Sequence, residues 1–405
     1  MSERFDTWKE IAAFFRREVR TVQLWEKHEE LPVHRQRHRK LGSVFAYRHE
    51  LETWWETRSK STQSLNPPSE NTAAPPPSRA SINQTLAEQV CGIGFHFWNQ
   101  RTRTSILKSI EYFKDAAALD PTCANAFAGI ANSYVSLSYN HLISAHKAAS
   151  LAYEAVQVAV RVNPYSLAVR NALISVLVNC TWDWKRAEDE CQRSIDSGLV
   201  DDRTIQLYSS LKGSQGQHQK AIELALQAHH LNPHGAAVNN HVSMAYLYAG
   251  DYSKALVYTQ NSLELEPQFL MGHVMLGRIE AQRGNWGLAL TAFEQAARLA
   301  ENSLFTLALT AYAHAGGGNL PKALELLAYL EARKQDECFP AYEVSAVHTL
   351  LGQQEQALEN LSRACEVRDM KTIFMQEDPR FSRLRHLAWF SRSSAALRLQ
   401  AMSCG

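Results

Sequence analysis

The stretch GQHQKAIELALQAHHLNP, residues 216–233, contains the two residue types that decide the fold of most of the chain. Its glycine and its alanine each recur about every 34 residues, and each recurring glycine precedes one of the alanines by five positions. The glycines are Gly216, Gly250, Gly284, Gly318 and Gly352, and the alanines are Ala187, Ala221, Ala255, Ala289, Ala323 and Ala357. A period of this length predicts a stack of helix–turn–helix repeats.

The physical properties of glycine and alanine explain why these two residues carry the period. A tight turn between helices needs a residue that tolerates a left-handed backbone, and glycine does so without a steric penalty. Two antiparallel helices that cross closely need a small side chain, and alanine supplies one with a high helix propensity. Prolines then end the second helix of several repeats, at Pro121, Pro164, Pro233 and Pro267.

These features resemble the tetratricopeptide repeat family over residues 87–369, which would hold roughly seven or eight repeats. Residues 94–134 are similar to the opening repeats of such arrays when these are fused to bacterial DNA-binding heads. The resemblance implies an all-α fold, a tetratricopeptide helical solenoid whose concave face is lined by the first helix of each repeat. Candidate residues for binding a protein or peptide partner on that face are Gln206, Asn240 and Arg278. Ordinary solvent-facing helix surface is the alternative for all three.

The first sixty residues differ from the rest of the chain. They contain 13 Lys and Arg against 10 Asp and Glu, and four of the nine tryptophans. Residues 61–83 are rich in Ser, Pro and Asn and poor in large apolar side chains, which is typical of a flexible linker. We therefore expect a head at 1–60, a linker at 61–83, a repeat solenoid at 84–369, and C-terminal capping helices with a tail at 370–405.

The head sequence predicts three helices and a hairpin. The stretch TWKEIAAFF predicts a first helix with Thr7 as its N-cap, and RTVQLWEKHEE predicts a second helix after a short basic turn. Alternating residues in LPVHRQRHRKLGSVFAYR predict two strands joined by a turn at Gly42. A third helix, HELETWWETR, would close the core through Leu51, Trp54 and Trp55.

This order of elements resembles the winged helix–turn–helix heads of the MerR and phage-excisionase type. The resemblance implies that the second helix enters the major groove of duplex DNA and that the hairpin, the wing, grips phosphates or a minor groove. Around the second helix the implied DNA contacts are Arg16, Arg17, Arg20, Thr21, Gln23 and Lys27. On and beside the wing they are Arg35, Arg37, Arg39, Lys40 and Arg48. The alternatives are a solvated strand pair for the basic run and plain helix surface for Arg20 and Gln23.

Other kinds of chemistry find little support in the sequence. The HHLNPH stretch at residues 229–234 contains three histidines, but no Cys or acidic residue stands at a suitable spacing for a metal site. Cys91 and His96 lack a recognisable third partner for nucleophilic catalysis. Neither a phosphate-binding glycine-rich motif nor an HExxH motif is present. We therefore expect no enzymatic activity, no metal and no cofactor.

The composition also indicates where the protein works. The chain has 405 residues and a formal net charge of +1, and it contains no apolar run of the roughly 20 residues that span a bilayer. The charged N-terminus lacks a hydrophobic signal core, and the seven cysteines include no CxxC pair. We expect a cytoplasmic protein with reduced thiols and no membrane association.

Together these patterns favour a bacterial DNA-binding transcriptional regulator whose solenoid binds a protein or peptide partner. Double-stranded DNA is the expected nucleic-acid partner. A homodimer bound to two half-sites would lengthen the short sequence that one head can read. Two other functions stay open: a non-catalytic scaffold or assembly protein, and an architectural, excisionase-like protein that bends DNA.

Overall fold

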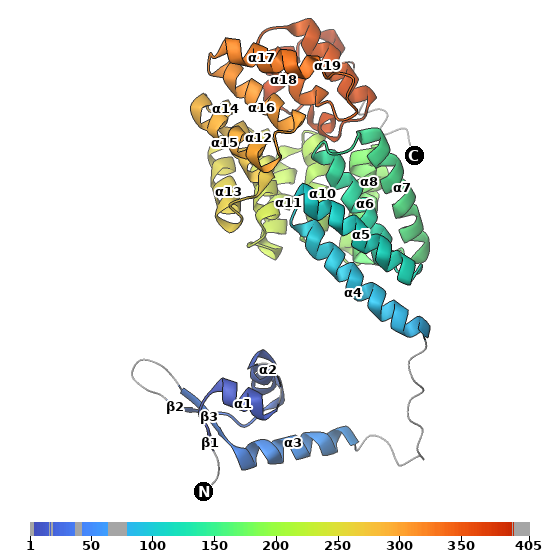
Figure 1. Cartoon of the computed structure of the whole chain (residues 1–405), viewed down its shortest axis with the longest axis vertical. Coiled ribbons are helices and arrows are strands. Elements are labelled where there is room, and N and C mark those ends of the chain that lie inside the picture. Colours follow the sequence, from blue (N-terminus) through green and yellow to red (C-terminus); the bar gives the residue numbers. More distant parts are fainter. Residues whose placement is uncertain are drawn as a thin grey trace. The chain divides into compact units, whose positions relative to one another are not determined.

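The computed structural model describes residues 4–36 except 16 and 18, residues 43–63, residues 79–390 and residue 392. The chain divides into two compact units, residues 1–76 and 77–405. We describe these units separately, as the head and the solenoid (Figure 1). The division falls inside the expected linker at 61–83, of which residues 64–78 lie outside the described part.

The head combines three helices with a small antiparallel sheet. The helices are α1 (Trp8–Phe14), α2 (Val19–Glu29) and α3 (Arg48–Gln63), and the strands are β1 (Arg4–Phe5), β2 (His34–Gln36) and β3 (Ser43–Tyr47). The strand order is β1-β3-β2. Thr7 caps α1 as predicted, because its side chain accepts a hydrogen bond from the backbone NH of Glu10. The sequence does not predict β1, since a two-residue strand has no readable alternation.

The apolar core of the head joins all three helices to the sheet. Ile11 on α1 and Leu51 on α3 have no exposed surface, and the Trp54 ring packs edge-on against Phe15 with 5.9 Å between centroids. Trp55 departs from the expectation of a core residue, because its side chain is 41% exposed although its ring contacts Phe15. Trp55 therefore lies at the edge of the apolar core, where α3 is partly exposed.

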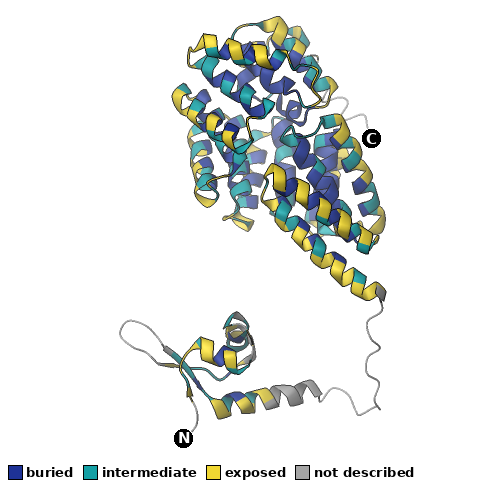
Figure 2. Ribbon diagram, viewed as in Figure 1, coloured by how far each residue is buried: buried dark blue, intermediate teal, exposed yellow. Residues whose placement is uncertain are grey.

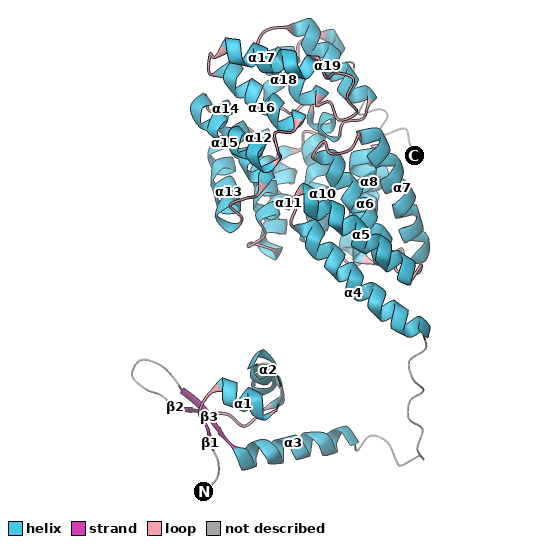
Figure 3. Cartoon of the chain, in the orientation of Figure 1, coloured by secondary structure: helices cyan, strands magenta, loops and turns pink. Residues whose placement is uncertain are grey.

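The solenoid is, within residues 79–390, a stack of eight antiparallel helix pairs (Figures 1 and 3). The first helices of the pairs are α4 (Arg79–Asn99), α6 (Ala124–Tyr139), α8 (Leu167–Val176), α10 (Asp202–Ser214), α12 (Ala236–Tyr248), α14 (Leu270–Gln282), α16 (Leu304–Gly316) and α18 (Ala341–Leu350). The second helices are α5 (Arg103–Leu119), α7 (Ala145–Val162), α9 (Trp184–Asp196), α11 (His218–Leu231), α13 (Tyr252–Leu265), α15 (Trp286–Leu299), α17 (Leu320–Glu331) and α19 (Gln354–Glu366). A π-helical turn, η1 (Leu177–Thr181), follows α8. The predicted fold class, an all-α tetratricopeptide-like solenoid after a small domain, is confirmed.

The recurring glycines and alanines occupy the positions that the period predicts. All five glycines have φ between 74° and 82°, in the left-handed region that favours glycine. All six alanines are at most 2% exposed, and each is the fourth residue of a second helix. Where the two helices of a pair cross, the Ser209 hydroxyl donates a hydrogen bond to the Ala221 carbonyl at 2.7 Å, and the Ser243 hydroxyl donates one to the Ala255 carbonyl at 2.8 Å. The helices of a pair therefore meet closely at the alanine.

Buried residues run continuously through the interior of the helix pairs, while the outer helix turns are exposed (Figure 2). Stacking of neighbouring pairs thus buries most of the apolar surface that a single repeat could not bury alone. Within the described part of the chain, no helix combines the length and the apolar character that a membrane span requires.

After α19 the chain turns back against the first helices of the solenoid. This return, residues 369–384, contains the 3-10 helices η2 (Met370–Phe374) and η3 (Pro379–Leu384), and we call it the closing segment. Its η2 contacts α6, α10, η1 and α19, and its η3 contacts α18. The sequence predicts capping helices in this region. The structure shows a segment that also bridges to the first half of the solenoid.

Gly277 on α14 provides a test of the close helix packing. A Cβ atom there would lie 2.3 Å from Cε1 of Phe293, a ring with no exposed surface. We expect Gly277→Ala to lower the free energy of unfolding by about 1–3 kcal/mol, because the well-packed ring must move. Gly287→Ala on α15 is the matched control, since a Cβ there meets nothing within 4 Å. It should be neutral or stabilising by roughly 0.5–1 kcal/mol in urea denaturation, and equal losses in both variants would contradict the packing argument.

Candidate functional site

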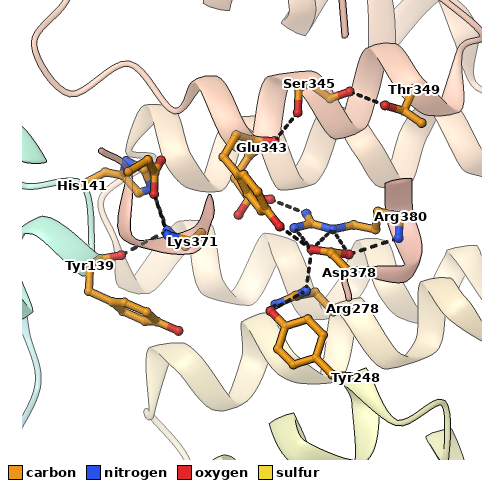
Figure 4. A network of polar contacts seen from close by, with 12 residues as sticks. Tyr139, His141, Tyr248, Arg278, Glu343, Ser345, Thr349, Lys371, Asp378 and Arg380 are labelled. Carbon is orange, nitrogen blue, oxygen red and sulfur yellow. Dashed lines mark hydrogen bonds and ion pairs between the residues drawn. The ribbon is translucent and has the colours of Figure 1, made fainter. Parts of the chain in front are cut away.

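A buried charged cluster surrounds Asp378 of the closing segment (Figure 4). Its carboxylate accepts hydrogen bonds from Nη2 of Arg380 at 2.7 Å and from Nη2 of Arg278 on α14 at 3.0 Å. The Tyr342 hydroxyl on α18 donates to the same carboxylate at 3.1 Å. Arg380 also pairs with Glu343 of α18. Two carboxylates thus balance two guanidiniums, and the cluster ties α14, α18 and the closing segment together.

A second group of contacts joins the closing segment to the end of α6. Nζ of Lys371 donates to the carbonyl of Tyr139 at 3.1 Å and to Nε2 of His141 at 2.6 Å (Figure 4). The His141 ring stacks on Phe305 of α16 with 5.1 Å between centroids, and Lys371 Nζ lies 4.2 Å from the centre of that ring. Because α6 and α16 belong to the second and the seventh helix pair, these contacts join parts of the solenoid that are far apart in sequence.

Burial and neighbouring charges set the protonation of these groups. Burial, reinforced by the Lys371 charge, lowers the pKa of His141 to about 4, so the neutral ring accepts the hydrogen bond from Lys371. Burial alone would raise the pKa of Asp378, but the Arg380 and Arg278 guanidiniums hold it well below its usual range. The closing segment is therefore held by charges at Asp378 and by a neutral histidine at His141.

The three residues expected on a partner-binding face all belong to first helices of the helix pairs. Arg278 belongs to the charged cluster, where its side chain is 11% exposed and is bound to Asp378. Gln206 on α10 is buried and donates from Nε2 to Asp202 at 3.2 Å. Asn240 on α12 lines the same cavity as Gln206, and its Oδ1 has no hydrogen-bond partner within the described part of the chain. Their role in partner binding stays a prediction.

The cavity next to Gln206 and Asn240, which we call the inner chamber, has a volume of about 180 Å³. It lies between η2 and the first helices of the middle pairs. Its polar walls come from Arg101, Ser136, Asn140, Asn179, Arg203, Gln206, Ser210, Asn240 and His241. Arg101, Arg203 and Gln206 also border a wider outer groove of about 690 Å³, whose lining includes Asn171, Asn232 and Glu266. The inner chamber and the outer groove thus share part of their walls.

The head presents two of the residues expected to contact DNA bases on one exposed face of α2. Gln23 and Lys27 are exposed and lie one helical turn apart. Arg20 lies in α2 about one turn before Gln23, and its side chain is outside the described part. Thr21 is half-buried, and Arg17 is exposed in the turn between α1 and α2. This part of α2 is thus a polar helix surface open to a macromolecular partner.

The two described arginines of the expected wing surface are exposed and have acidic partners. Arg35 on β2 donates from Nε and Nη2 to Oε1 of Glu26 on α2, at 3.2 Å and 2.6 Å. Arg48 donates from Nε to Glu52 at 2.8 Å. The pair between Arg35 and Glu26 places a basic side chain of β2 beside α2. The expected contacts that lie outside the described residues are Arg16, Arg37, Arg39 and Lys40.

Sequence reasoning missed the residues that close the solenoid. Lys371 could have been recognised from its position in MKTIFM, a run of mostly apolar residues. A charged side chain that is buried with such a run needs a partner. Arg101 and Arg203 of the inner chamber carry no such signal, because residues so far apart in sequence show no common pattern. Within the described residues, no group of three His, Cys, Asp or Glu side chains could hold a metal ion.

Comparison with known proteins supports the solenoid fold. No protein-family model and no curated protein sequence matches the chain. The human IFIT1 dimer with m7Gppp-AAAA is 15% identical over 89% of this chain and 85% of that one, with a TM-score of 0.51. The APC/C hetero-tetramer Cut9–Hcn1 is 14% identical over 81% of this chain and 59% of that one, also with a TM-score of 0.51. A tetratricopeptide repeat protein from Parabacteroides merdae ATCC 43184 covers 60% of this chain at 14% identity, 98% of its own length and a TM-score of 0.42. The two structures with TM-scores of 0.51 share the helical solenoid fold. With its eight stacked helix pairs, the chain belongs to the class of tetratricopeptide-like helical solenoids.

Asp378 provides a test of the charged cluster. Asp378→Asn removes one of the two carboxylates that balance Arg278 and Arg380 in a buried place, so we expect the free energy of unfolding to fall by about 3–5 kcal/mol. Glu325→Gln is the matched control, because Glu325 pairs with Lys322 while its side chain is 65% exposed. That change should cost at most about 1 kcal/mol. Urea denaturation measures both, and a loss at Asp378 as small as the control would show that the cluster does not hold the fold.

Because two histidines are buried in the neutral form, we expect the free energy of unfolding to fall in acid. The pKa of His141 is lowered to about 4, by burial and by Lys371, and that of His241 to about 3, by burial and by Arg203. The unfolded chain takes up these protons near pH 6.5, whereas the folded chain does not. Stability should therefore fall as the pH drops from 7 to 5, by on the order of 2 kcal/mol for each histidine.

Urea denaturation at pH 7 and pH 5 measures this difference. His141→Gln should reduce it, whereas His230→Gln on the exposed surface of α11 should leave it unchanged. A stability that is the same at both pH values would contradict the burial of two neutral histidines.

Proposed function

We propose that the protein is a DNA-binding transcriptional regulator whose head contacts duplex DNA and whose solenoid binds a protein or peptide partner. The observation that carries this proposal is the exposed polar face of α2, with Gln23 and Lys27 one turn apart, beside the strand pair of β2 and β3. A helix of this kind fits the major groove, and an adjacent strand pair can reach the DNA backbone. The winged helix–turn–helix resemblance of the head sequence supports the same function.

The head would use two kinds of contact with DNA. Gln23 would read base edges through its side-chain amide, while Lys27 and Arg17 would neutralise phosphates and release counterions. Arg35 already has a carboxylate partner in Glu26, so it would exchange that carboxylate for a phosphate on binding. Glu26 would then oppose binding, because it places a negative charge close to the expected path of the phosphates.

The solenoid would hold its partner in the outer groove. That groove is larger than the inner chamber, and side-chain amides of Asn132, Asn171, Asn232 and Gln206 line it. Amides can donate to and accept from the backbone of an extended peptide. A solenoid of similar fold occurs in the Cut9–Hcn1 hetero-tetramer, a complex with a second protein. We further propose a cytoplasmic protein that binds two DNA half-sites as a homodimer.

Fluorescence anisotropy of the full-length protein with labelled duplex DNA tests this function. We expect affinity to fall steeply as salt rises, and we expect Lys27→Ala to weaken binding and reduce the slope of log affinity against log salt by about one. Lys9→Ala is the matched control, since Lys9 is exposed on α1 and outside the expected surface. Glu26→Gln should strengthen binding. No binding of the wild-type protein at low salt would overturn the regulator.

A scaffold or assembly protein is the second candidate function. The observation that favours it is exposed apolar surface on the solenoid, where Leu320 and Leu324 lie one turn apart on α17 and are 48% and 49% exposed. A scaffold would bind a partner protein without binding DNA in the anisotropy experiment. An architectural protein would bind DNA but show diffuse genome-wide occupancy, whereas a regulator would show discrete promoter sites.

A further inference from the structure

The inner chamber brings two arginine side chains together without giving either an ion-pair partner. Arg101 follows α4 and Arg203 lies in the first turn of α10, yet both guanidiniums lie over the Trp98 ring. Their Cζ atoms are 3.5 Å and 5.8 Å from its centroid. Nη1 of Arg101 donates to Ser136 Oγ at 3.3 Å. Arg203 makes no hydrogen bond or ion pair with any described residue, and its buried Nε is unpartnered.

The charge around these two arginines is not balanced inside the chamber. No described acidic residue lines the inner chamber. From the outer groove Asp201 and Asp202 attract Arg203, and Glu266 attracts Arg101, but within the described residues none of the three forms an ion pair with either guanidinium. Burial, followed by the like charge of Arg203, lowers the pKa of Arg101 to about 9. Burial also lowers the pKa of Arg203. The two half-buried guanidiniums repel each other, and this repulsion costs free energy. An anion bound between them would offset the repulsion.

A further polar group beside the chamber has no partner among the described residues. His241 on α12 is 8% exposed, lines the chamber, and has a buried Nε2 without a hydrogen-bond partner in the described part of the molecule. Because its ring is neutral, one of its nitrogens can donate to an anion. Buried polar groups are rarely left unsatisfied. The unpartnered Nε of Arg203 and Nε2 of His241 therefore point to a ligand group that accepts hydrogen bonds, while the unpartnered Oδ1 atoms of Asn140 and Asn240 can accept from a hydroxyl or amide elsewhere on the ligand.

The remaining walls of the chamber are apolar. They include Met244, Phe269, Met271, Met370 and Phe374. A dry apolar cavity of about 150 Å³ is sufficient for a benzene ring, so a chamber of about 180 Å³ admits a ligand of ring size and no folded polypeptide. Methionine side chains are flexible, so the methionines of this wall can adjust to the shape of a ring-sized apolar ligand.

We propose that the inner chamber binds a small organic oxyanion, with a carboxylate or phosphate group held between Arg101 and Arg203 near His241. An attached aromatic or branched apolar body lies against Met244 and Phe374. The planar guanidinium fork matches the oxygens of either group. The closing segment forms one wall of the chamber, so the ligand binds the closed solenoid and stabilises it. This site is distinct from DNA binding and does not depend on it.

Isothermal titration calorimetry and thermal unfolding of the full-length protein test the site with four probes. Phenyl phosphate and phenylacetate carry the two oxyanions on a ring, inorganic phosphate lacks the ring, and benzyl alcohol lacks the charge. We expect at least one ring oxyanion to bind and raise Tm, with inorganic phosphate weaker and benzyl alcohol without effect. Whichever ring compound binds identifies the oxyanion as phosphate or carboxylate.

Arg203→Gln should reduce the affinity for the ring oxyanion about tenfold or more, because hydrogen bonds to a charged group are lost. It should change Tm without ligand only slightly, because Arg203 forms no hydrogen bond or ion pair with a described residue and its positive charge lies near a helix N-terminus. Arg298→Gln, an exposed arginine on α15, is the matched control and should bind as the wild type does. The proposal is overturned if neither ring oxyanion binds, or if Arg203→Gln binds as tightly as the control. Failure of DNA binding alone leaves it untouched.

Discussion

The buried carboxylate of Asp378 is the constraint on which the closed form of the solenoid depends. A charge without exposed surface is tolerated only when opposite charges and hydrogen-bond donors surround it. Arg278, Arg380 and Tyr342 meet that requirement, and they come from α14, from the closing segment and from α18. Repeat proteins usually have contacts between neighbouring repeats alone. Here one ionic cluster adds a contact across the superhelix, so the curvature of the repeats cannot change without breaking it.

The closing segment also determines which part of the concave face is available. Where Lys371 reaches Tyr139 and His141, the ends of distant helix pairs are joined and covered. Beside the closing segment lies the inner chamber, and the wider outer groove adjoins it, with Arg101 and Arg203 at the border of both. The small anion and the peptide of the two proposals would thus meet the same two arginines. Binding of one would be felt by the other through those shared side chains.

The sequence was informative wherever a local rule controls the structure. Gly216 and Ala221 recur because every repeat has the same turn and the same helix crossing, and Thr7 can be recognised as a cap from its immediate neighbours. The contact of Asp378 with Arg278 has no such basis, since it joins residues 100 positions apart and depends on how eight pairs accumulate their curvature. Strand β1 was missed because two residues show no period. Trp55 was placed too deep because helical spacing alone does not reveal where a core ends.

The position of the closing segment after α19 has a consequence for the order in which the protein is made. During synthesis each helix pair can stack on the preceding one as it leaves the ribosome, because its contacts are local. Arg278 and Glu343 are synthesised before Asp378 and Arg380, so their charges stay hydrated until the last of the described elements arrives. Translation therefore first yields a stack of helix pairs that lacks the contacts made by the closing segment. The fully curved body can form only after the ribosome has passed the codons of the closing segment, so the curvature is acquired only after all eight helix pairs have been made.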